Sequence, residues 1–277
     1  YLDQILSYLL SRRNNKIYYS LGRIMKLCII SLNEPFYLRY YINDLFIHYK
    51  DNIDSIVLVS AKTPAESYQR YISRLHKMYG VKAFLWTATK YLTITMMDMF
   101  NCLFYRSKLS RVCDIAKSHG ISTSHIKDIN NSEFVSYIKR ERVDVILSIA
   151  CPQIFKKELL NAPQWGCINL HGGLIPEYRG VFSSFWVLME NDQFTGVTVH
   201  KMNNIIDGGE AYAREKIEIE TNETVNSLLH KTTKIGIAVL IDVMSRILSG
   251  NEDSLEYDIN SGKYRSYPQK KDLIRFL

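Results

Sequence analysis

Short apolar runs alternate along this chain with longer segments typical of helices. The runs "KLCIIS" (26–31) and "SIVLVSA" (55–61) enclose a segment from Pro35 to Lys50 that is long enough for a helix, which makes a β-α-β unit. Farther along, a capped helix is expected from Ser132, followed by a strand from Val143 to Ala150. The alternation predicts an α/β fold, Rossmann-like, with a mainly parallel open sheet and helices on both faces.

The pattern of expected strands and helices divides the chain into three parts. Residues 1–25 precede the first strand and are predicted to form a helical extension, and residues 26–220 to form the main α/β domain. Residues 221–277 should supply one helix, ending near Gly250, and a short C-terminal extension that is either a tail or a small hairpin.

Composition excludes several classes of protein. Asp98 interrupts the richest apolar segment, so no stretch reaches the roughly 18 residues that would span a bilayer, and the start lacks the features of a signal peptide. We therefore expect a cytoplasmic protein with no membrane partner. The five cysteines include no CxxC pair, and the seven histidines do not cluster at metal-ligand spacing, so no metal is predicted. The net charge of +7 would attract an anionic ligand, or it reflects basic residues on a solvated surface.

Three polar residues lie where packing alone explains them poorly. Asn169 lies inside an apolar run, His171 ends that run, and Asp207 precedes two glycines. Residues two apart on a strand point to the same face, so Asn169 and His171 can flank one reacting atom. An amide can hold a developing oxyanion, an imidazole can exchange a proton at neutral pH, and Asp207 could orient the imidazole. Taken singly, each also has a structural explanation, as a strand-end or turn residue.

The two segments that carry these residues resemble a known family. "INLHGGLIPEYRG" followed by "GVTVHKMNNIIDGGE" is similar to the folate-dependent formyltransferases, which include the methionyl-tRNA, glycinamide ribonucleotide and nucleotide-sugar enzymes. The resemblance covers about residues 26–220 and is close over 143–210. It implies the formyltransferase fold and an enzyme that uses 10-formyltetrahydrofolate as cosubstrate.

The resemblance also implies roles for individual residues. The family's catalytic Asn, His and Asp correspond to Asn169, His171 and Asp207. The folate site is expected along the strand before them and its turn, largely through backbone groups. The expected folate-binding residues are Ala150, Cys151, Pro152, Gln153, Ile154 and Gly172, and the expected acceptor-binding residues are Tyr178, Arg179 and His200.

The acceptor is harder to read from the sequence. The resemblance implies that a tRNA acceptor would need a sizeable C-terminal barrel, and only 27 residues follow Gly250, which argues against tRNA; no nucleic-acid partner is expected. "ISLNEPFYL" lacks the glycines of the phosphate-binding loop usual in the glycinamide ribonucleotide enzymes. We therefore expect the acceptor to be the amine of a nucleotide-linked amino-deoxy sugar. A glycinamide ribonucleotide formyltransferase, a formyltetrahydrofolate hydrolase and a silent folate-binding protein remain alternatives, and a homodimer is possible.

Overall fold

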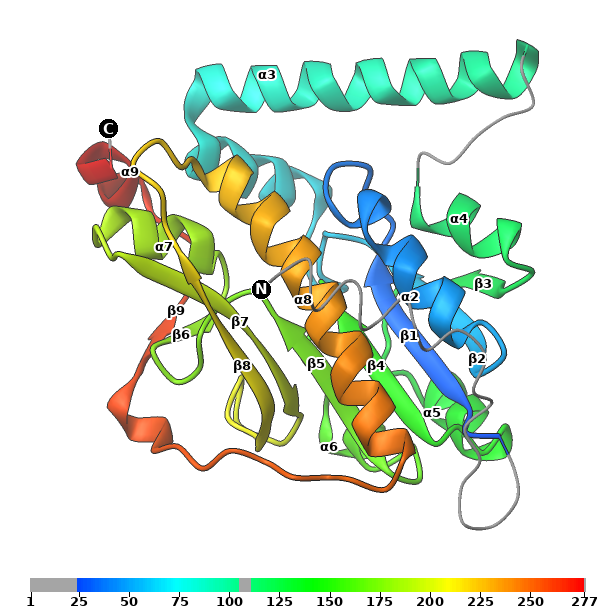
Figure 1. Cartoon of the computed structure of the whole chain (residues 1–277). Coiled ribbons are helices and arrows are strands. Elements are labelled where there is room, and N and C mark those ends of the chain that lie inside the picture. Colours follow the sequence, from blue (N-terminus) through cyan, green and yellow to red (C-terminus); the bar gives the residue numbers. More distant parts are fainter. Residues whose placement is uncertain (1–23, 105–110, 277) are drawn as a thin grey trace.

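A seven-stranded sheet forms the centre of the protein (Figure 1). The computed structural model describes residues 24–104 and 111–276. The strand order is β3-β2-β1-β4-β5-β7-β8; the first five strands are parallel, and β7 and β8 are antiparallel to their neighbours. The bounds are β1 Leu27–Leu32, β2 Ile53–Val59, β3 Ser122–His125, β4 Val145–Ile149, β5 Gly166–His171, β7 Phe194–Lys201 and β8 Ala211–Glu218. The predicted mainly parallel open sheet is confirmed.

Helices cover both faces of this sheet. One face carries α2 (Ile42–Tyr49), α4 (Val112–Ser118) and α8 (Val225–Leu248), and the other carries α5 (Ser132–Arg140) and α6 (Lys157–Leu160). Side chains of β1 alternate between the two: Leu27 and Ile29 join the core under α8, and Cys28 and Ile30 join the core under α5. Strands that are buried on both faces consist of nearly continuous apolar residues, so these segments could be recognised as strands from the sequence.

Two helix starts are fixed by side-chain caps. Asn131 precedes α5, and its side chain accepts a hydrogen bond from the backbone N–H of Phe134. Thr224 precedes α8 and forms a reciprocal capping box with Ser227. The α8 helix packs on β5 and β7, the strands that carry the candidate site residues, so it belongs to the core of the main domain.

The longest helix, α3 (Tyr68–Phe104), joins two segments that the sequence pattern separates, 65–79 and 91–106. It bends at Gly80, whose φ of 68° lies in the region that favours glycine. Figure 1 shows its second half running above the ends of the central strands. None of the helices within the described ranges has the length and apolar character required to cross a membrane.

The last part of the chain does not form the small hairpin considered above. It contains η2 (Ile259–Ser261), β9 (Lys263–Arg265) and α9 (Lys270–Phe276). Instead of pairing with a neighbouring segment, β9 pairs in parallel with β6 (Tyr178–Gly180), which lies between β5 and α7 (Ser183–Met189). The hairpin expectation was wrong because the partner of β9 is more than 80 residues away in sequence. The predicted N-terminal extension, 1–25, falls almost wholly outside the described residues.

Candidate active site

Four polar side chains meet at the carboxyl end of β5. Asn169 and His171 come from β5, His200 from the neighbouring β7, and Asp207 from the loop before β8. The antiparallel register pairs Asn169 with His200, and the Asn169 Nδ2 atom lies 3.1 Å from His200 Nε2. Asp207 lies between the imidazoles, with Oδ2 3.7 Å from His171 Nδ1 and Oδ1 3.6 Å from His200 Nε2. The fold thus brings the three predicted catalytic residues together, and adds His200.

Backbone carbonyls determine where the two imidazoles carry their protons. The His171 Nε2 atom lies 2.7 Å from the carbonyl oxygen of Tyr178, which can only accept, so this nitrogen donates. The His200 Nδ1 atom likewise donates to the carbonyl of Lys201 at 3.0 Å. In a neutral His200, Nε2 then accepts an N–H of Asn169. His171 Nδ1, which faces Asp207, is the position where an added proton would be stabilised.

The Asp207 carboxylate is buried yet strongly favoured in its ionised form. Burial raises the pKa of this carboxyl, but His171, His200 and a 2.7 Å hydrogen bond from the Gly180 N–H together lower the pKa to about 2. Its side chain is 10 % exposed, and its φ of 49° is unusual for a residue other than glycine. Asp207 is therefore a fixed negative charge between two histidines at neutral pH.

This lowered pKa makes a prediction about stability. Because the folded-state pKa lies below the ordinary 3.8, ionised Asp207 should stabilise the fold above that pH and lose its contribution as pH falls through about 2. The contribution should be about 2 kcal/mol at pH 5 and about half of that at pH 3. Urea unfolding of the wild type and Asp207→Asn at both pH values measures it. An equal difference between the two proteins at both pH values would contradict the prediction.

The loop after β5 passes so close to His171 that one of its glycines cannot be replaced without movement. A Cβ on Gly173 would lie 2.8 Å from the Ser183 Cβ and 2.9 Å from His171 Nε2. Thr198, fully buried on β7, donates to the Gly173 carbonyl at 2.8 Å and accepts from the Ile175 N–H at 3.1 Å. The loop is thus hydrogen-bonded to β7, the strand that carries His200. It also carries the Tyr178 carbonyl, which accepts the proton of His171 Nε2.

A strap formed by residues 255–267 holds this loop from outside. Its strand β9 pairs with β6, and the Val181 N–H donates to the Arg265 carbonyl at 2.9 Å. Tyr257 donates from its hydroxyl to the carbonyl of Gly209, beside Asp207, and Trp186 donates to the carbonyl of Ser266 at 3.1 Å. The strap therefore contacts both segments that supply the surroundings of His171 and Asp207.

A glycine in the strap offers a test of this support. At Gly262 a Cβ would lie 1.6 Å from the Pro176 carbonyl oxygen, so Gly262→Ala should push β9 away from β6. We expect formyl transfer to fall about tenfold or more, as a displacement of about 1 Å far from the chemistry can do. Lys263→Ala is the control, because Lys263 is exposed on β9 and alanine there adds no atom. Equal kcat values for the two variants, measured with saturating substrates, would show that the strap is not needed to position the site.

The expected folate-binding segment lies at the same edge of the sheet. Ile149, the last residue of β4, pairs with Leu170, so the turn from Ala150 to Ile154 begins beside His171. The side chain of Gln153 is occupied within the protein, since Oε1 accepts from the Ile129 N–H at 3.1 Å and Nε2 donates to the Lys127 carbonyl at 3.0 Å. Of this turn, Ile154 is 66 % exposed and can contact a ligand through its side chain.

The other folate-turn residues offer mainly backbone. Ala150 has a φ of 54°, and the half-buried Cys151 and Pro152 follow it. Burial raises the pKa of the Cys151 thiol to about 12, so it is not a thiolate. Gly172 accepts a hydrogen bond from the Ser183 hydroxyl through its carbonyl. This arrangement agrees with recognition of a ligand by main-chain groups.

The three expected acceptor-binding residues differ in how they are placed. The buried Tyr178 directs its hydroxyl to Glu190 and Asp192, so its side chain points into the protein and its carbonyl serves His171. His200 is 2 % exposed and contacts Asn169 and Asp207 instead of solvent. Arg179 is half-buried, and among the described residues its Nε has no hydrogen-bond partner.

Sequence reasoning did not single out two residues of this region, Thr198 and Ser183. Thr198 lies two residues before His200 on β7, so the same alternation that marked Asn169 and His171 could have marked it. Ser183 carries no such signal, because it follows a loop and begins the short helix α7.

Comparison with known proteins shows the family of this chain. The sequence profile described as "Formyl transferase" matches residues 81–244, more than half of the 277 residues. The chain belongs to the formyl transferase family. The matched range includes all four residues of the polar cluster.

Relatives within the formyl transferase family differ in acceptor. A methionyl-tRNA formyltransferase of Agathobacter rectalis is 32 % identical over 142 residues, 51 % of this chain and 46 % of that protein. The chain thus spans about half the length of the curated relative. A sugar N-formyltransferase from Shewanella sp. FDAARGOS_354 has a TM-score of 0.58 at 20 % identity, covering 92 % of this chain and 87 % of that one. A Helicobacter canadensis N-formyltransferase bound to folinic acid and dTDP-3-aminofucose has a TM-score of 0.57 at 17 % identity, covering 88 % and 71 %. The structural similarity shows the shared fold.

Proposed function

We propose that this formyl transferase moves a formyl group from 10-formyltetrahydrofolate to the primary amine of a nucleotide-linked amino-deoxy sugar. The observation that carries the proposal is the cluster of Asn169, His171 and Asp207 at the carboxyl edge of a doubly wound sheet, where ligands of such folds bind. The matching family profile supports the reaction class.

Asn169 is proposed to hold the negative charge that develops on the formyl oxygen. Its amide nitrogen carries two hydrogens, and the contact with His200 uses one of them. The second can be donated to a ligand oxygen at the half-buried end of β5. A donor fixed in advance by a neighbouring side chain loses little freedom when charge develops, which is what makes such donors effective.

His171 and Asp207 are proposed to move and stabilise the proton that the amine loses. When the amine nitrogen bonds to the formyl carbon, one of its N–H bonds must break, and the proton must finally reach the nitrogen that leaves. His171 Nδ1 can hold a proton beside Asp207 while Nε2 stays bonded to the Tyr178 carbonyl. His200, which contacts both Asn169 and Asp207, is proposed as a positioning residue for the pair.

The residues at this edge fit a folate. When bound, 10-formyltetrahydrofolate supplies the formyl group. The turn from Ala150 to Ile154 presents backbone groups and an exposed isoleucine, while the occupied side chain of Gln153 locks it to residues 127–129. A flat, partly apolar heterocycle held by main-chain hydrogen bonds suits such a turn.

An aromatic and cationic cluster favours a nucleotide on the acceptor. The ring of His230 on α8 lies 5.0 Å from that of Tyr37 and 5.7 Å from that of Tyr40, both in the segment after β1. Lys90 lies 5.5 Å from the centroid of Phe36, and Arg39 lies 4.7 Å from that of Tyr40. Rings stack on a base, and cations attract a diphosphate. The Helicobacter canadensis protein, of the same fold, was solved with a nucleotide-linked amino sugar.

The test is an acceptor panel. The protein is incubated with 10-formyltetrahydrofolate and separately with amino-sugar nucleotides, glycinamide ribonucleotide and methionyl-tRNA, and acceptor mass and tetrahydrofolate release are followed. We expect one formyl group to be added to a sugar nucleotide and not to the other two. His171→Asn serves as the control for contaminating activity.

Each other result has a definite meaning. Formylation of glycinamide ribonucleotide or methionyl-tRNA alone would keep the reaction and reject the acceptor. Formate release without an amine would indicate a hydrolase, and folate binding without turnover would reject an enzymatic role.

A further inference from the structure

The second half of α3 turns an apolar face to solvent. Leu85, Leu92, Met96 and Met99 are each between 57 % and 63 % exposed. Their spacing of seven, four and three residues places them along one side of the helix. Large side chains exposed singly are ordinary, but a stripe of four on one helix usually marks a surface that binds something.

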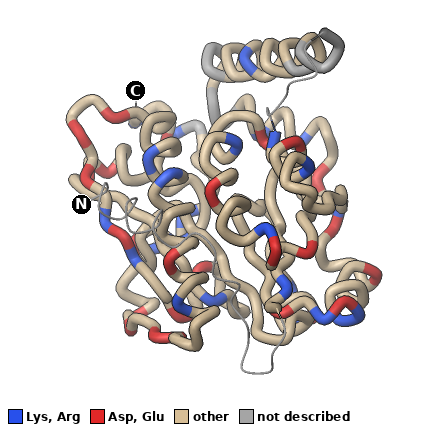
Figure 2. Tube along the Cα trace, turned by 45° about the vertical axis from the view of Figure 1, so that its right-hand side comes forward, with Lys and Arg blue, Asp and Glu red and all other residues tan. Residues whose placement is uncertain are grey.

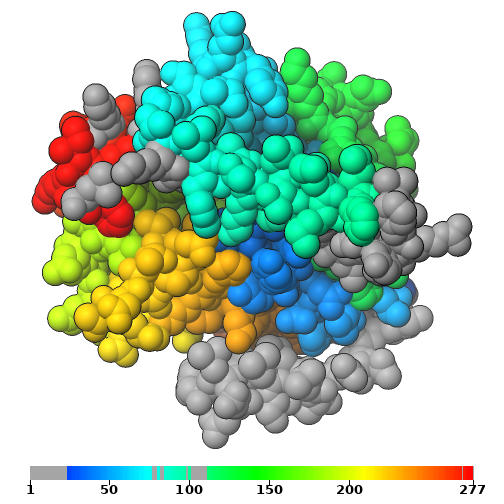
Figure 3. Space-filling view, turned by 90° about the horizontal axis from the view of Figure 1, so that it is seen from above, coloured from blue at the N-terminus to red at the C-terminus, as the bar shows by residue number. Residues whose placement is uncertain are grey.

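The opposite side of the same helix is held against the protein. The ring of Tyr91 lies 6.1 Å from that of Phe36, and the Arg111 guanidinium lies 5.8 Å from the Tyr91 centroid. Arg111 also donates to the Thr95 hydroxyl at 3.1 Å. These contacts orient the helix on the domain, so the apolar stripe faces outward. Figure 3, seen from above, shows α3 as a broad teal band across this face.

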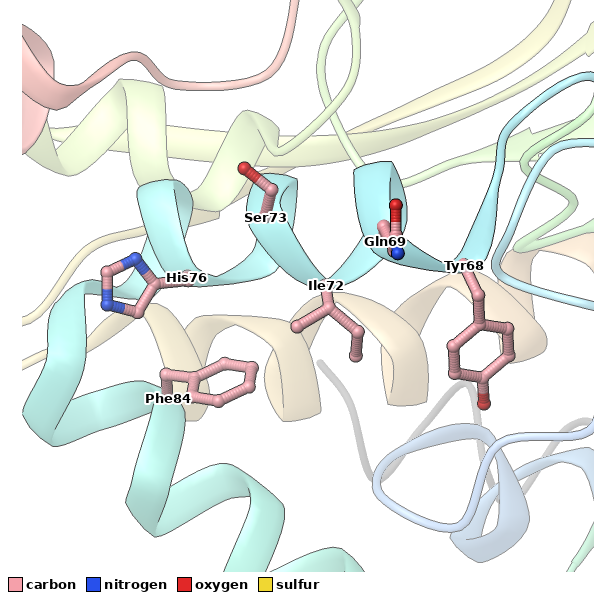
Figure 4. A pocket seen from close by; sticks show the side chains of 6 residues that line it. All are labelled: Tyr68, Gln69, Ile72, Ser73, His76 and Phe84. Carbon is pink, nitrogen blue, oxygen red and sulfur yellow. The ribbon is translucent and has the colours of Figure 1, made fainter.

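A cleft of about 480 Å³ lies at the bend of α3. Tyr68, Ile72 and His76 from the first half and Phe84 from the second line it, together with Gln69 and Ser73 (Figure 4). The cleft is separate from the polar cluster on β5 and β7, since none of its lining residues belongs to those strands. Phe84 lies seven residues before Tyr91, so the cleft opens on the same side of the second half as Tyr91 and is separate from the outer stripe.

The charge of the protein is concentrated in the same segment. The α3 helix, Tyr68–Phe104, contains five Lys and Arg residues and one acidic residue, Asp98. The remainder of the chain holds 30 Lys and Arg residues and 27 Asp and Glu residues, so α3 carries a net charge of +4 out of the total of +7. Figure 2 shows residues of both signs mixed over the body of the protein.

We propose that the outer face of α3 binds along the surface of an anionic phospholipid membrane. An apolar stripe bordered by the exposed Trp86, on a basic helix, is the pattern of helices that lie in the interfacial plane. Such binding differs from crossing the membrane, for which neither the sequence nor the described helices contain a suitable segment. A second copy of the chain is the less suitable occupant, because two such basic segments would repel each other at close range.

Bound in this way, the protein would face the membrane with the edge of the sheet that carries the candidate site. The β2 strand ends at Val59, and α3 follows it at the carboxyl edge where Asn169 and His171 lie. Figure 1 shows the second half of α3 above that edge. The inference stands apart from the acceptor assignment and does not depend on it.

Vesicle flotation tests the proposal. Wild-type protein is mixed with vesicles of phosphatidylcholine alone or of phosphatidylcholine with phosphatidylglycerol, and the bound fraction is measured. We expect binding only to the anionic vesicles, weakening from about 0.1 M to about 1 M salt as screening grows. Leu92→Asp and Met96→Asp should each weaken it about tenfold or more, the contribution of one buried side chain of this size.

Ile47→Asp is the matched control, since Ile47 is an exposed apolar residue on α2, at 42 % exposure. It should bind vesicles like the wild type, and thermal unfolding should confirm that all variants are folded. Equal binding by the α3 variants and the wild type, absence of binding to anionic vesicles, or equal binding to neutral vesicles would overturn the proposal. Light scattering that shows a dimer disrupted by Leu92→Asp, without vesicle binding, would assign the face to a second copy.

Discussion

Replacing His171 with asparagine is expected to lower kcat for formyl transfer about 10³-fold, within the range found for loss of a general acid–base group. The Nδ1 atom beside Asp207 is the only imidazole position in the described cluster that is not already committed to a carbonyl or an amide. Asparagine keeps a polar side chain but cannot exchange a proton near neutral pH. Single-turnover measurement of tetrahydrofolate release isolates the chemical step from product release.

A control for this variant is His125→Asn, because His125 is exposed at the end of β3, in the same sheet. It should leave kcat unchanged. For His171→Asn, the KM values are a second readout and should change little, because the proposed proton transfer belongs to the chemical step. If the variant retained more than about a tenth of the wild-type rate, His171 would not be the group that moves the proton.

Asn169→Ala is expected to cost about 10²–10³ in kcat, the effect of removing one oxyanion donor. The KM values should change little, because an interaction made mainly in the transition state affects the rate and not ground-state binding. Alanine also removes the partner of His200 Nε2, which lies 3.1 Å from the Asn169 amide.

His200→Phe separates these two effects. If Asn169 acted only by holding His200, both variants would show the same loss of activity. If Asn169 donates to the reacting oxygen, its loss should be the larger. Asn161→Ala, at the exposed end of α6, serves as the control for a neutral asparagine replacement.

The sequence revealed the sheet because its strands are buried on both faces. The run Leu27–Leu32, for example, is apolar except for Ser31 and could be recognised as a strand without knowledge of its neighbours in the sheet. The spacing of Asn169 and His171 on one strand likewise predicted a shared face. Asp207 could be joined to them only through the family resemblance, since its approach depends on the turn between β7 and β8.

Other features could not be predicted, because they depend on contacts between residues far apart in the sequence or on a choice between several local structures. Nothing in "GKYRS" indicates that it pairs with Tyr178–Gly180, because strand partners distant in sequence leave no mark on either segment alone. His200 could be recognised as a strand-end residue, but not as the link between Asn169 and Asp207. The bend at Gly80 was also missed, since a single glycine in an apolar, helix-like region has several structural explanations.

The pairing of β9 with β6 has a consequence for the order in which this protein matures. During synthesis the residues of the polar cluster leave the ribosome early, and α8 can then close the sheet beneath them. The loop that fixes the His171 proton still lacks its neighbouring strand until residues 263–265 have been made. A nascent chain that stops before that point would hold the chemical groups without their final support. Full activity should therefore require that the chain is synthesised beyond residues 263–265.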